Sequence, residues 1–266
     1  MTKTISGHMI IKNGVKFDYP FVEACLSILP ICDEFIFIEG NGEDGTYEKL
    51  LELQSSNPKI KIFRENWQKE HFSVLSELTN VAIERCKCNY HFQIQADECV
   101  HERFLPEIKK AANTNADYFI FGVKHFFSNF NTIYNPGVYY DSFIRFAKKK
   151  TYPKLRSYDD AMSLGCPDSD SACFRENQLT GIKVFHYGYV RKPKSLIEKQ
   201  KQMTKWWGYQ ELDQYLQDGE DAGQINWGQK FTPDKLRPFD DTHPLVIQKW
   251  IAERSDIVSS GLVKEE

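Results

Sequence analysis

Strand-type and helix-type segments alternate through the first part of the chain, and this alternation limits the possible folds more than any other feature. Short apolar runs predict strands at residues 5–11, 35–38, 60–63 and 90–95. Apolar residues at helical spacing predict intervening helices that begin near Pro20, cover 47–53 and cover 72–85. This order implies an α/β fold with a mostly parallel sheet and helices on both faces.

The pattern changes after Glu102. It predicts a helix at 104–112, strands at 118–123 and 182–185, and an antiparallel edge strand at 138–147. Polar residues 151–172 predict a loop in which a helix starts near Asp160, and the chain from Pro193 onward predicts helices. We therefore expect one domain over residues 1–190 and a helical C-terminal extension over 191–266 that packs back on it.

Composition excludes some classes of protein. A formal net charge of −3 gives no general attraction to nucleic acid or anionic lipid. Seven cysteines lack the paired spacing of a zinc site. The number of cysteines is odd, and we see no secretory leader in the sequence. Together these observations predict reduced thiols and a cytoplasmic location. No apolar run approaches the roughly 20 residues that span a bilayer, so we expect a soluble protein, with peripheral contact to a membrane surface left open.

Functional candidates follow three of the predicted strands. Asp97 ends the strand that begins at Tyr90, and His186 ends the strand at 182–185. The carboxyl ends of strands form the ligand crevice in open α/β sheets. A carboxylate and an imidazole there predict a site for Mn²⁺ or Mg²⁺, which would hold a diphosphate. The alternatives are that Asp97 caps the next helix and that His186 is a hydrogen-bonded structural residue.

The third strand end is the glycine-rich turn from Glu39 to Thr46. Its glycines allow the backbone to approach a ligand closely. Glu39 and Asp44 are candidates to accept hydrogen bonds from a base or ribose, and we assign Asn41 to the same binding segment. The alternative is an ordinary connection between a strand and a helix.

Three segments together resemble a known family. They are FIEGNGEDGTYEKL from Phe37, QIQADECVHE from Gln93 and FHYGYVRKP from Phe185. In this order they resemble the inverting, family-two type of GT-A glycosyltransferases, in a bacterial and viral branch. The resemblance covers roughly residues 5–193. It implies a Rossmann-like GT-A fold, a nucleotide-sugar donor, a divalent metal, and a glycan or other hydroxyl acceptor.

The resemblance also implies roles for single residues. Asp97 matches the ligand of metal and diphosphate, with His186 as a second metal ligand. Glu39 stands where the family often has an Asp that contacts the nucleobase. Gln95 stands where many relatives carry the first Asp of a DxD motif, so one charge of that motif is missing. Either the metal is then bound weakly or Gln95 faces the sugar of the donor, and we assign Gln95 to the donor site. The catalytic base is expected at Asp160, with Asp159 as the alternative, although both residues would also suit a helix cap.

The expected activity is transfer of a sugar from a nucleotide diphosphate to a hydroxyl, with inversion. Trp67, Tyr187, Trp206 and Trp207 are candidates to stack on sugars. A sugar-nucleotide pyrophosphorylase would need a glycine-rich basic loop after its first strand, which this chain lacks. A non-catalytic carbohydrate- or nucleotide-binding module remains the main alternative, because Gln95 would suit a degenerate site.

Overall fold

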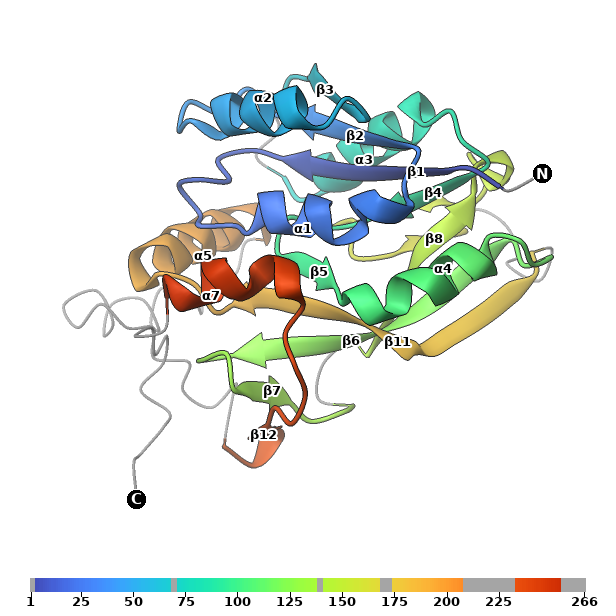
Figure 1. The fold of residues 1–266 in the computed structure, drawn as a ribbon. Coiled ribbons are helices and arrows are strands. Elements are labelled where there is room, and N and C mark those ends of the chain that lie inside the picture. Colours follow the sequence, from blue (N-terminus) through green and yellow to red (C-terminus); the bar gives the residue numbers. More distant parts are fainter. Residues whose placement is uncertain (1–2, 68–70, 138–140, 168–173, 208–232, 255–266) are drawn as a thin grey trace.

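The computed structural model describes residues 3–67, 71–137, 141–167, 174–207 and 233–254. Its first half confirms the predicted alternation, with β1 (Ile5–Ile11), α1 (Phe21–Ile28), β2 (Glu34–Glu39), α2 (Thr46–Ser56), β3 (Ile60–Arg64), α3 (Ser73–Arg85) and β4 (Tyr90–Gln93). β1 pairs in parallel with β2 and with β4, and β2 pairs in parallel with β3. The parallel part of the sheet therefore has the order β4-β1-β2-β3 (Figure 1).

The second half adds β6 (Tyr118–Phe127), β7 (Thr132–Tyr134) and β8 (Ser142–Lys148). β8 is antiparallel, as expected, but it lies between β4 and β6, so the predicted edge position is wrong. The reason is aromatic packing across neighbouring strands. The Phe146 ring lies 4.9 Å from that of Tyr90 and 5.1 Å from that of Phe119, and all three residues are buried.

A long strand, β11 (Glu176–Tyr189), replaces the short strand predicted at 182–185. It pairs in parallel with β6 and antiparallel with β5 (Glu98–Val100), which places His186 opposite Glu98. The sheet is therefore mixed, and β5 and β11 bring two predicted site segments together. Two short strands, β9 (Arg156–Ser157) and β10 (Leu164–Gly165), form a separate pair.

Helices cover both faces of the sheet because successive strand residues point to opposite sides. On β2, Phe35 and Phe37 pack in one core with α1, α2 and α4 (Leu105–Ala111). Ile36 and Ile38 pack in another core with α3. Figure 1 shows α1 and α4 in front of the sheet and α3 behind it.

The described part of the C-terminal extension contains α5 (Pro193–Trp207), β12 (Leu236–Pro238) and α7 (Gln248–Ala252). Its apolar side chains pack against residues of β6 and β7. β12 joins the sheet beside β7, so this part is not entirely helical. The Arg254 guanidinium, just after α7, donates to the Asp18 carboxylate before α1. The domain boundary near residue 190 stays a prediction.

Five short 3₁₀ helices complete the described elements: Leu29–Ile31, Glu102–Phe104, Lys149–Thr151, Pro233–Lys235 and Leu245–Ile247. Among the described helices, none has both the length and the apolar character needed to cross a bilayer.

Candidate active site

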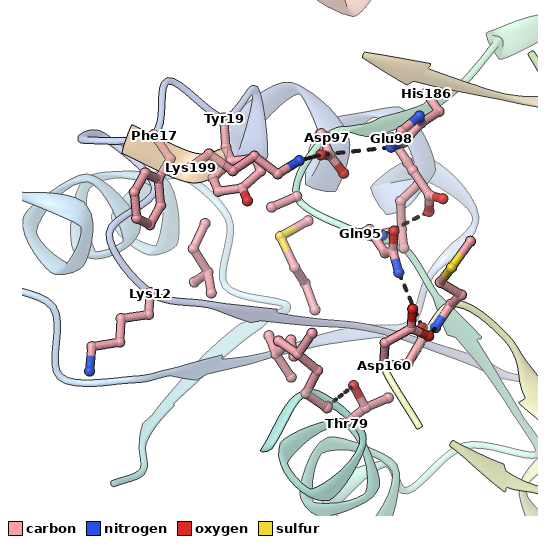
Figure 2. Close-up of a pocket in the computed structure, with 18 of the residues that line it drawn as sticks. Lys12, Phe17, Tyr19, Thr79, Gln95, Asp97, Glu98, Asp160, His186 and Lys199 are labelled. Carbon is pink, nitrogen blue, oxygen red and sulfur yellow. Dashed lines mark hydrogen bonds and ion pairs between the residues drawn. The ribbon is translucent and has the colours of Figure 1, made fainter. Parts of the chain in front are cut away.

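A cavity of about 540 Å³ opens where β1 and β4 end. The strand ends supply Ile11 and Lys12 on one side and residues 93–98 on another, and α5 contributes Lys199 and Met203. Figure 2 shows the carboxylates of Asp97 and Asp160 on different sides of Gln95, with Lys199 beside Asp97. The cavity therefore lies at the edge of the sheet where the sequence predicted a ligand crevice.

Asp97 lies in the turn between β4 and β5. The Glu98 amide donates to the Gln95 carbonyl at 3.1 Å, and the Tyr187 amide on β11 donates to the Asp97 carbonyl at 2.8 Å. The Asp97 Oδ2 atom accepts from Arg191 Nη2 at 2.9 Å and from Lys199 Nζ at 3.2 Å. The carboxylate is thus a cavity residue, as predicted, and it is held by two basic side chains.

Burial by itself raises the pKa of Asp97, but the positive charge of Lys199 and the neighbouring His186 and Arg191 outweigh burial and hold that pKa well below its ordinary value. Asp97 is therefore ionised at neutral pH. Burial also lowers the pKa of Lys199 to about 8, with Arg191 acting in the same direction and Asp97 opposing both.

His186 lies between Asp97 and a second histidine. Its Nε2 is 3.8 Å from Asp97 Oδ2, and its Nδ1 is 2.9 Å from His125 Nδ1. Burial lowers the pKa of His186 well below its ordinary value, against the opposing effect of Asp97. The structure therefore brings together the two residues predicted as metal ligands.

This arrangement does not fit a resident divalent cation. Arg191 and Lys199 both bind the Oδ2 atom of Asp97, on the side where the metal would lie. Their positive charges would repel a divalent ion at that position. Within the described ranges, no group of three or more His, Cys, Asp or Glu residues is placed to hold a metal ion. A hard divalent cation normally takes several oxygen ligands, and here one carboxylate is available.

Gln95 and Glu98 connect this turn to the loop that follows β8. Gln95 Nε2 donates to the Ala161 carbonyl at 3.1 Å. Glu98 accepts from the Gln95 amide at 2.9 Å and from Arg145 Nη2 at 2.6 Å. Glu98 and Arg145 are both about 1% exposed, and Arg145 also donates to the Met162 carbonyl. Gln95 thus lines the cavity, and its side chain positions the opposite wall.

Asp160 and Asp159 occupy different environments. Asp160 lines the cavity and accepts from the Met162 amide at 3.2 Å, whereas Asp159 is exposed. Burial raises the pKa of Asp160, and the neighbouring Asp159 acts in the same direction. The predicted helix start is wrong, because Asp159 and Ala161 have left-handed φ values of 48° and 61° and the segment forms turns.

The turn after β2 is organised by its own side chains. Glu39 is fully buried and accepts from Arg64 Nε at 2.7 Å and from the Gly42 amide at 2.6 Å. Asp44 accepts from the Thr46 amide at 3.1 Å and from the Lys16 amide at 2.6 Å. Asn41 donates to the Glu65 carbonyl at 3.2 Å.

None of Glu39, Asn41 and Asp44 lines the described cavity, so their assignment to the donor stays a prediction. Among the aromatic candidates, Trp67 and Trp206 line the cavity and their rings stack at 6.3 Å. Tyr187 is fully buried away from the cavity, and the Trp207 side chain lies outside the described part of the chain.

Sequence reasoning missed both basic partners of Asp97. Arg191 directly follows the predicted HYGYV segment, and its position after a strand end is a usable signal. Lys199 lies on a helix 102 residues from Asp97, and helical periodicity alone does not mark it. Tyr19 was also missed as a cavity residue. Its ring lies 4.3 Å from the Arg191 guanidinium carbon and 5.4 Å from Lys199 Nζ.

Comparison with known proteins identifies one matching family. The sequence model described as Glycosyl transferase family 2 matches residues 10–174, which is more than half of the chain. A comparison with curated proteins gave no match.

Similar solved structures include S. aureus TarS residues 1–349, at 10% identity and a TM-score of 0.46, covering 76% of this chain and 65% of that one. Another is GalNAc-T7 with UDP, GalNAc and Mn²⁺, at 12% identity and a TM-score of 0.47, covering 84% of this chain and 52% of that one. The chain spans less than two thirds of the length of each.

Proposed function

The chain belongs to glycosyl transferase family 2, and from this membership we propose that it transfers a sugar from a nucleotide diphosphate donor to a hydroxyl group of an acceptor. The observation that carries the proposal is the cavity at the carboxyl ends of β1 and β4. Its walls hold a basic group beside Asp97 and a separate carboxylate at Asp160. Such a reaction needs a positive site for the leaving diphosphate and a base for the acceptor.

Asp160 is the base in this proposal. Its carboxylate lines the cavity and its pKa is raised by burial, so it binds a proton more strongly than an ordinary carboxylate does. It would take the proton of the acceptor hydroxyl as that oxygen attacks the anomeric carbon. Asp160 and the Asp97–Lys199 pair lie on different sides of Gln95, which supports attack opposite to the leaving group and therefore inversion.

Trp67 and Trp206 offer a flat apolar surface for the sugar or base. The acceptor, a glycan or another hydroxyl compound, stays a prediction, as do the cytoplasmic location and peripheral membrane contact. No comparison tests the Mn²⁺ or Mg²⁺ predicted at Asp97 and His186, and the two basic side chains on Asp97 disfavour it. The role given to Asp160 needs no bound metal.

The test uses paired variants of adjacent carboxylates. Nucleotide sugars are first screened by thermal shift, since a bound donor stabilises the native state. With the donor that binds, Asp160→Asn should lower the rate of nucleoside diphosphate release by about 10²- to 10⁴-fold with near-normal donor affinity. Asp159→Asn is the control, because Asp159 is exposed and lies outside the cavity.

The main alternative is a non-catalytic binding module, and the same experiment separates the two. A module would bind a nucleotide sugar or glycan without turnover in any acceptor or hydrolysis assay. Absence of binding by every nucleotide sugar, with and without divalent metal, would contradict the proposed donor class itself.

A further inference from the structure

The negative charge of Asp97 is already compensated by a buried arginine. Arg191 is fully buried, and its Nη2 binds Asp97 Oδ2 at 2.9 Å while its Nη1 donates to the Phe17 carbonyl at 2.9 Å. Arg191 does not line the cavity. It therefore fixes Asp97 against the loop that follows β1, and the two charges cancel.

Lys199 is then a surplus positive charge at the cavity wall. Two basic side chains face the single charge of Asp97, and the nearby Glu98 is compensated separately by Arg145. The Lys199 side chain is 11% exposed and lines the cavity. An ammonium group has three N–H donors. Among the described residues, the structure gives this group one hydrogen-bond acceptor, Asp97, and places it 5.4 Å from the Tyr19 ring.

This surplus charge has the chemistry that a diphosphate requires. A buried ammonium group beside a cavity binds phosphate oxygens by charge-assisted hydrogen bonds. A divalent cation at Asp97 would instead add two positive charges next to Lys199 and Arg191, with one carboxylate to offset them. The same position is therefore favourable for an anion and unfavourable for a metal ion.

We propose that Lys199 binds the diphosphate of the donor directly and that donor binding does not require a divalent cation. Asp97 then acts as a positioning residue, because it holds the Lys199 ammonium group at the cavity wall. The inference rests on the proposed function, since it names the diphosphate group of that donor as the ligand. It gives helix α5, in the C-terminal extension, a direct part in the site.

The test is calorimetric titration of the full chain with UDP, GDP and dTDP, in EDTA and then in excess MnCl₂. One of these should bind in EDTA with an affinity within about threefold of that in Mn²⁺. Lys199→Gln should weaken that binding by about 10- to 100-fold, as expected for loss of a charged hydrogen bond, and leave binding of the matching nucleoside unchanged. Lys194→Gln is the control, because Lys194 is exposed on the same helix.

Two results would overturn the inference and leave the proposed function intact. One is binding that appears only with Mn²⁺, which would restore the metal site predicted at Asp97 and His186. The other is metal-free binding that Lys199→Gln and Lys194→Gln weaken equally. The wild-type comparison of EDTA with Mn²⁺ decides whether donor binding requires a divalent cation even if Lys199→Gln does not fold. If UDP, GDP and dTDP all failed to bind in both buffers, that result would contradict the inference and the proposed function together.

Discussion

Replacing Gly188 by alanine should displace the His186 imidazole. Both residues lie on β11, two positions apart, where the pairing of β11 with β6 is irregular between His186 and Tyr189. A Cβ at residue 188 would lie 2.3 Å from His186 Cε1 and 2.5 Å from Nε2. Carbon atoms in contact are normally about 3.5–4.0 Å apart, so the ring must move by about 1 Å or more.

The energetic cost follows from what surrounds the ring. Overpacking of this kind costs about 1–3 kcal/mol, and loss of the 2.9 Å hydrogen bond to His125 adds about 0.5–1.5 kcal/mol. Alanine restricts the unfolded chain more than glycine does, and this stabilises the folded state by about 0.4–1 kcal/mol. We expect a net destabilisation of about 0.5–4 kcal/mol. At about 2–4 °C per kcal/mol this lowers the melting temperature by roughly 1–16 °C.

Gly181→Ala is the matched control on the same strand. A Cβ at residue 181 meets no atom within 4 Å, so this variant should melt at or slightly above the wild-type temperature. Thermal unfolding of both variants at one pH is the assay. If Gly188→Ala melted as high as Gly181→Ala, the reasoning that Gly188 makes room for the His186 ring would be refuted.

Three further predictions concern other parts of the structure. Glu98→Gln should lower stability by about 3–5 kcal/mol in urea unfolding, because it leaves the charge of Arg145 buried without its partner; an unchanged midpoint would contradict this. Asp44→Ala should cost about 1–3 kcal/mol through loss of the two hydrogen bonds that its carboxylate accepts from the Thr46 and Lys16 amides; a large loss of donor affinity in the folded variant would instead support the predicted donor contact. Burial lowers the pKa of His243 to about 4, below its ordinary value, and its Nδ1 accepts from the Tyr187 hydroxyl. The stability that neutral His243 contributes is therefore complete above about pH 6.5 and is lost as pH falls toward 4. At pH 5 the loss amounts to about 1–2 kcal/mol, after allowance for the partial exposure of the ring. The melting temperature of the wild type should therefore fall between pH 7 and pH 5, and His243→Asn should reduce that fall.

The sequence by itself determined the order of strands and helices in the first half and the position of Asp97. Apolar runs and helical spacing reflect backbone periods of about 2 and 3.6 residues, which a short window of sequence displays fully. The end of such a run also marks the sheet edge, and Asp97 lies in the cavity there. His186 also lines the cavity, but it lies within β11 and not at the end of a strand. The HYGYV segment carried the signal for the strand end that β11 supplies.

Only the tertiary structure decided the partners and the surroundings of these residues. Arg191 and Lys199 meet Asp97 from 94 and 102 residues away, and no local pattern encodes such a distance. Asp159 and Asp160 look alike in sequence, but two left-handed residues turn the loop so that only Asp160 lines the cavity. Burial and charge pairing depend on which segments the sheet brings together, and they set the chemistry of each carboxylate.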